Sequence, residues 1–68
     1  MNGFDIEKVA NKFELDKTQI VNIELQKGKY TDYDLVVWLE QPRWNNPDET
    51  EVIDSVHHLY AGEVDHYR

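Results

Sequence analysis

Cysteine is absent from this sequence of 68 residues, so neither a disulfide nor a thiolate metal site stabilises its fold. A chain this short hides only about 60% of the surface that it exposes when unfolded, and apolar packing alone has to stabilise it. A chain without cysteine also suits a reducing compartment. We therefore expect a single domain over residues 1–68 that works in the cytoplasm.

Long apolar runs are also absent. No stretch approaches the roughly 20 apolar residues that a membrane span needs. The N-terminal residues lack a basic start followed by an apolar run. The sequence therefore predicts a protein that neither enters a membrane nor is exported.

Glycine and serine are too sparse for the common catalytic motifs. The glycines at positions 3, 28 and 62 are too far apart to cradle a phosphate. Ser55 is the one serine, and it lacks the flanking glycines of a hydrolase nucleophile. A small core also leaves little room for a deep pocket. We expect no catalytic residues, no cofactor and no enzymatic activity.

The histidines lie near acidic residues and form the one group that resembles a metal or catalytic site. Asp54 and His58 are four residues apart and would share one face of a helix. His57 and His58, however, point about 100° apart on a helix, and no metal-binding spacing such as HExxH is present. We therefore expect these side chains, and His66, to be solvated and to bind no metal.

Positive charge is scarce in the second half of the chain, which has a net charge of −7 overall. Residues 1–30 hold five acids and five lysines, which cancel, whereas residues 31–68 hold nine acids against Arg43 and Arg68. Such an excess repels phosphate backbones and anionic lipids, and it attracts a basic partner at long range. The sequence thus predicts no direct binding to nucleic acid or to membranes.

One helix is expected near the N-terminus. In FDIEKVANKF, the residues Ile6, Val9, Ala10 and Phe13 share one helical face, and Asp5 is a candidate cap. The pattern predicts a helix over about 5–14.

A second helix is expected near the C-terminus. Asn46 is a candidate cap, Pro47 suits the first helical position, and Gly62 suits the residue after the helix. Apolar residues recur between them at helical spacing, which predicts a helix over about 47–61. This apolar stripe consists of Val52, Ile53, Val56, Leu59 and Tyr60.

Between these helices, the sequence predicts a hairpin. Val21, Ile23 and Leu25 alternate with polar residues, which is typical of a half-buried strand. The glycine of KGK then supplies a turn, and YDLVVWLEQ is rich in β-branched and aromatic residues. We expect strands at about 19–26 and 33–40.

The fold class is therefore predicted as α+β, a small single domain with a short antiparallel sheet in the order helix, strand, strand, helix. Residues 63–68 are a candidate third strand, because a sheet of two strands is only marginally stable. In the strand at 33–40, Trp38 points away from the side that Leu35 and Val37 share. That second face needs a helix, a strand or a partner to cover it.

The middle of the chain also allows a different interpretation. VANKFELDKTQIVNIE resembles the helix-turn-helix of phage repressors, with Ala10 packed against a second helix that Asp16 caps. The resemblance implies a DNA-binding transcriptional regulator that uses residues 6–25. The sequence departs from the family at Glu14, where the family commonly has a glycine. Because an acidic domain lacks the cations that a recognition helix at 17–27 needs, the hairpin is favoured.

The acids and Trp44 form the candidate partner-binding surface. Trp44 follows Arg43 in the loop QPRWNNP, where it either anchors an interface or folds back onto the core. A rigid acidic surface imitates the phosphates of DNA, and small acidic bacteriophage proteins often inhibit host proteins in this way. We therefore expect a phage-encoded inhibitor or DNA mimic that engages a basic host protein, for example one that binds nucleic acid. The protein itself is expected to be a monomer or a dimer. A structural subunit of an assembly is a further alternative. The candidate binding residues are Asp32, Asp34, Glu40, Trp44, Asp48, Glu49, Glu51 and Asp54.

Overall fold

The computed structural model describes residues 3–68 and shows an α+β fold, as the sequence predicts. A three-stranded antiparallel sheet, with its strands side by side in chain order, follows one helix and precedes another, so the layout is helix, three strands, helix. Two single turns of 3-10 helix, η1 and η2, complete the chain. The elements are α1 (Ile6–Phe13), η1 (Lys17–Gln19), β1 (Ile20–Lys27), β2 (Tyr33–Arg43), β3 (Asn46–Leu59), α2 (Ala61–Val64) and η2 (Asp65–Tyr67).

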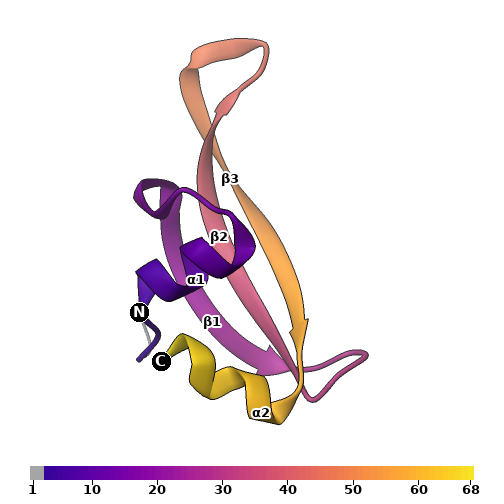
Figure 1. The fold of residues 1–68 in the computed structure, drawn as a ribbon. Coiled ribbons are helices and arrows are strands. Elements are labelled where there is room, and N and C mark those ends of the chain that lie inside the picture. Colours follow the sequence, from indigo (N-terminus) through magenta and orange to yellow (C-terminus); the bar gives the residue numbers. More distant parts are fainter. Residues whose placement is uncertain (1–2) are drawn as a thin grey trace.

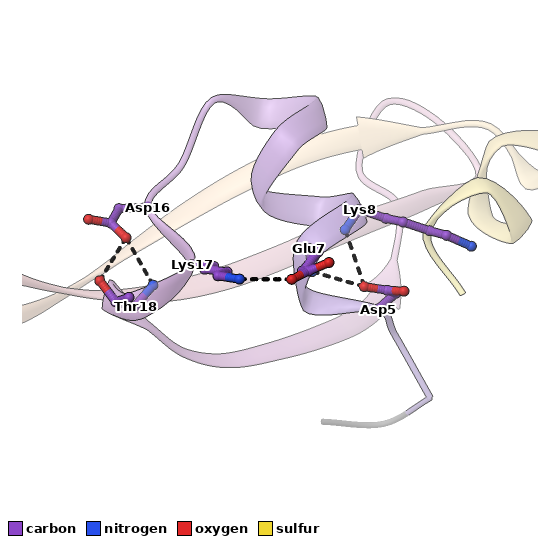
Figure 2. A network of polar contacts seen from close by, with 6 residues as sticks. All are labelled: Asp5, Glu7, Lys8, Asp16, Lys17 and Thr18. Carbon is purple, nitrogen blue, oxygen red and sulfur yellow. Dashed lines mark hydrogen bonds and ion pairs between the residues drawn. The ribbon is translucent and has the colours of Figure 1, made fainter.

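Helix α1 confirms the expected N-terminal helix and its cap. The carboxylate of Asp5 accepts hydrogen bonds from the backbone N–H groups of Glu7 at 2.9 Å and Lys8 at 3.3 Å (Figure 2). The helix ends at Glu14, which adopts the left-handed conformation with φ 56° and ψ 42°. The chain therefore makes a left-handed turn at Glu14, the position where the resemblance to phage repressors implies a glycine.

The segment after this turn is a strand, so the helix-turn-helix interpretation is wrong. Asp16 does act as a cap, but of η1, where its carboxylate accepts from the backbone N–H and hydroxyl of Thr18 at 3.0 and 2.7 Å (Figure 2). Residues 20–27, which would include most of a recognition helix, form β1. The three β-branched residues at positions 20, 21 and 23 favour this outcome, since they lose rotamer freedom in a helix.

The hairpin of β1 and β2 confirms the predicted strand pair. Gly28 permits its turn because a Cβ there would lie 1.8 Å from the carbonyl oxygen of Thr31. One detail of the expected β1 pattern is wrong. The register shifts between Ile20 and Asn22, so Ile20 joins Ile23 in the core while Val21 is 50% exposed.

Strand β3 occupies the region for which we expected a C-terminal helix over 47–61, so that prediction is wrong. β3 pairs with β2 in regular register from Leu59, opposite Tyr33, to Thr50, opposite Pro42. Thr50, Val52, Ile53 and Val56 are β-branched, and a paired strand accommodates them better than a helix. The local capping signals at Asn46 and Pro47 are therefore outweighed by pairing with β2.

Residues 63–68 form α2 and η2 rather than the candidate third strand. Gly62, expected just after a helix, lies inside α2. The turn into α2 is fixed by two carboxylates, because Glu63 accepts from the backbone N–H of Tyr60 and Asp32 accepts from that of Ala61, both at 3.0 Å. The third strand that the sheet requires comes from β3 instead.

The core lies between one face of the sheet and the two helices, which pack on the same side of it (Figure 1). Both ends of the described chain meet at this layer, since the backbone N–H of Asp5 donates to the carbonyl of Tyr67 at 2.8 Å. Trp38 points to the other face of the sheet, as expected, and no described helix covers that face. The buried core residues are Phe4, Val9, Ala10, Ile20, Ile23, Leu35, Val37, Leu39, Leu59, Val64 and Tyr67.

Candidate interaction surface

The hairpin of β2 and β3 extends beyond the rest of the molecule as a two-stranded arm. Strand β1 pairs with β2 only as far as Leu39, so residues 40–52 continue without a third strand beside them. Figure 1 shows this hairpin rising past α1 and β1, and the molecule measures 40 × 23 × 18 Å along its principal axes. We call residues 40–52 the acidic arm.

The arm ends in a turn at Trp44 and Asn45, between Arg43 at the end of β2 and Asn46 at the start of β3. Trp44 is 95% exposed. Of the two alternatives for this side chain, folding back onto the core is therefore wrong. An indole that contacts almost nothing in its own chain is free to contact a partner.

Charge on the arm is strongly one-sided, with four acids against Arg43. Arg43 lies 3.3 Å from Glu49, which neutralises part of that carboxylate's charge. The hydroxyl of Thr50 donates to Glu40 at 2.8 Å across the two strands. Within residues 3–68, no ion pair involves Asp48 or Glu51. The arm is consequently a negative surface with an exposed indole at its end.

Asp54 lies at the root of the arm, opposite Trp38, on the face of the sheet that the helices leave uncovered. Six of the eight candidate binding residues thus lie on or next to the arm. These six are Glu40, Trp44, Asp48, Glu49, Glu51 and Asp54.

Asp32 and Asp34 lie at the opposite end of the sheet and form internal contacts. Asp32 caps the turn into α2, as described above. Asp34 accepts from the backbone N–H of Lys29 at 3.3 Å, and its second oxygen lies 2.7 Å from Nδ1 of His58. The sequence placed these two acids in one surface with the arm, whereas the structure separates them from it.

The histidines do not converge. His57 lies on the helix side of β3, where its ring stacks on Phe13 with a centroid distance of 3.5 Å, and His58 points to the other face. Burial, and next the neighbouring charge of His58, hold the pKa of His57 below its usual value. His66 lies on η2. Among residues 3–68, no three side chains of the metal-binding types are grouped to hold an ion.

Ser55 and His57 also make a close contact, with Oγ 3.3 Å from Nε2. Both are on one strand, two residues apart. The polar contacts of His57 within the described residues include no carboxylate, so the orienting partner of a catalytic triad is lacking there. The contact between Ser55 and His57 is therefore a local one between neighbours on a strand, without the arrangement that activates a nucleophile.

A shallow hollow on the helix side was not expected from the sequence. It lies between α1 and the C-terminal turns, and it presents both cations and an anion. Tyr67, at its floor, has a raised pKa because of burial and, secondarily, the charge of Glu63. The residues that line this hollow are Lys8, Asn11, Lys12, Glu63, His66 and Tyr67.

The sequence analysis also misses exposed apolar residues on β3 and directly after it. Val52, Val56 and Tyr60 were expected in the buried stripe of a helix but are 58%, 44% and 62% exposed. Of that stripe, only Leu59 is fully buried, and Ile53 packs at the edge of the core. The density of β-branched residues between positions 50 and 56 was the signal for a strand.

The chain matches no family model, no curated protein and no solved structure. No helix within residues 3–68 is long and apolar enough to cross a lipid bilayer. Any functional interpretation therefore depends on the surfaces described above.

Proposed function

We propose that this protein is a non-enzymatic binding protein that uses the acidic arm to engage a basic macromolecule. The observation that carries the proposal is the arm itself, a projecting two-stranded ribbon with four acids, one cation and a tryptophan that is 95% exposed. Projection makes both faces of the ribbon accessible, and the charge steers a basic partner toward it. Trp44 then supplies apolar contact area where the partner docks on the tip of the arm.

The partner class that this surface favours is a protein that itself binds nucleic acid. A basic groove built for phosphates accepts a row of carboxylates in their place. The role we propose is that of an inhibitor, in the manner of small acidic bacteriophage proteins that act as DNA mimics. Action in the cytoplasm fits a chain without cysteine.

A second candidate function is that of a structural subunit. The helix-free face of the sheet supports it, because Trp38 is only half-buried there and Val52 and Val56 are exposed beside it. A face of this kind is suited to packing within an assembly.

The proposal is tested by capturing the partner on the tagged protein from host lysate and eluting it with rising salt. A triple variant, D48K/E49K/E51K, reverses the charge of the arm and changes the net charge from −7 to −1, since three acid-to-lysine changes add 6. The matched control, E14K/E24K/D65K, has the same net charge but alters only the body. We expect the partner to be retained by the control and lost from the arm variant. Equal retention by both variants would exclude the arm as the binding surface.

A further inference from the structure

Within residues 3–68, β3 is an edge strand whose only neighbour in the sheet is β2. The backbone N–H and C=O groups along its outer side therefore lack a sheet partner within the described residues. Such an edge is a template for another strand, and proteins usually protect it with proline, charge, a bulge or a covering element.

The two halves of β3 differ in this protection. The half that belongs to the arm carries Pro47, Asp48, Glu49 and Glu51, which oppose edge pairing. Residues 53–59 contain no proline and no lysine, carry Asp54 as their one acid, and pair with β2 in regular register, without a bulge. The opposite edge of the sheet, β1, is interrupted by the bulge at Val21. The unprotected edge is thus confined to residues 53–59.

We propose that residues 53–59 pair antiparallel with the same residues of a second copy of this chain, with a two-fold axis at Val56. The sequence of this segment is complementary to itself in that register. Asp54 faces His58 of the second copy, and Ile53 faces Leu59. Val56 faces its own counterpart. Shifting the axis to Ser55 would set Asp54 against Val56, and shifting it to Asp54 would set two carboxylates against each other.

The same register continues rows of side chains that already exist within each sheet. On the helix-free face, Val36 lies opposite Val56, so the pairing extends this pair into an apolar row of four valines across both copies. His58 already contacts Asp34 at 2.7 Å. In the dimer, its imidazole lies between Asp34 of its own chain and Asp54 of the second copy.

The product is a continuous antiparallel sheet of six strands with the helices of both copies on one side. Because the two β3 strands run in opposite directions, the acidic arms point away from each other at the two ends. The dimer does not depend on what the arms bind. Its main-chain hydrogen bonds also make it far less sensitive to salt than contacts between charged surfaces.

Sedimentation velocity of the full chain tests this pairing. We expect a dimer that persists at high salt. V56K places two lysines directly opposite each other at the two-fold axis, so this variant is expected to be monomeric. V21K makes the same change at an exposed strand position on the opposite edge, and it should remain dimeric. A wild-type chain that sediments as a monomer, or a dimeric V56K with native circular dichroism, would overturn the proposal.

Disulfide trapping tests the register independently of the lysine variants. The chain has no cysteine, so V56C introduces one thiol per copy. Residues directly opposite each other in an antiparallel pair have Cα atoms about 4.5–5.5 Å apart, within the range of a disulfide. In V52C the two thiols are eight residues out of register, about 27 Å apart at 3.4 Å per residue. We expect a covalent dimer on oxidation of V56C and none from V52C. Equal crosslinking of both variants, or of neither, contradicts the register.

Discussion

Glu14 adopts an unfavourable backbone conformation at the end of α1. Its φ of 56° lies in the left-handed region, which costs a non-glycine residue about 1 kcal/mol or more. The turn is held because the backbone N–H groups of Glu14 and Leu15 both donate to the carbonyl of Ala10. The conformation thus ends α1 and directs the chain toward η1.

We expect E14G to stabilise the protein. Relief of the left-handed strain should exceed the extra entropy of glycine in the unfolded chain, raising the free energy of unfolding by about 0.5–1 kcal/mol. Urea denaturation measures this difference. E14A, which keeps the strain, is the control and should give no gain. If E14G is less stable than the wild type, the carboxylate of Glu14 stabilises the fold by more than the left-handed backbone conformation costs.

The second prediction concerns His57. Because burial lowers its folded pKa, the unfolded state takes up a proton more readily than the native state does. The stabilisation from neutral His57 is fully present above the unfolded pKa of about 6.5 and is lost as pH falls through the lower folded pKa. Urea midpoints across this range should therefore decline more steeply in the wild type than in H57F, which keeps the stack on Phe13 without a titrating group. Parallel pH profiles of the two proteins would contradict this account.

Local signals in the sequence predict α1 and the β1–β2 hairpin because local and tertiary preferences agree there. Asp5 caps a helix whose apolar face meets the sheet, and the glycine of KGK permits the turn. In residues 46–59 these preferences conflict. Capping signals and helical spacing favour a helix, while β-branched residues and the free edge of β2 favour a strand, and no local pattern reports that β2 needs a partner.

The arm is the element that the sequence predicts least well, and the proposed function depends on it. Its acids and Trp44 were recognised from charge and loop position, but their placement on a projecting ribbon depends on the length of β3 beyond β1. Asp32 and Asp34 were grouped with them by sequence proximity alone. Their carboxylates hold α2 and His58 instead.

We expect W44A to weaken binding while leaving the stability of the fold almost unchanged. Since Trp44 is 95% exposed, its removal should change the free energy of unfolding by less than about 0.5 kcal/mol. Binding to the captured partner should weaken by about 2 kcal/mol or more, as for a buried interface anchor. Calorimetry gives the affinity, and W44F, which keeps an aromatic ring, should recover part of the loss. Unchanged affinity in W44A would show that the tip of the arm stays outside the interface.

The charged surface and the apolar surface lie on different parts of the molecule. The core and the helices lie on one side of the sheet, the helix-free face lies on the other side, and the acidic arm with Trp44 projects beyond both. Net charge and its asymmetry were readable from the sequence. Which acids share a surface was not, because that depends on strand register, which sets the neighbours of each side chain across the sheet.

The arm's role as the charged binding surface is tested most directly by the salt dependence of affinity for the captured partner. Isothermal titration across a series of salt concentrations gives the slope for the wild type, for D48K/E49K/E51K and for E14K/E24K/D65K. We predict a steep loss of affinity with salt for the wild type and the body variant. The arm variant should bind roughly 10–100-fold more weakly at low salt, with a much flatter slope. The same steep slope and affinity in all three proteins would contradict the proposed role of the arm.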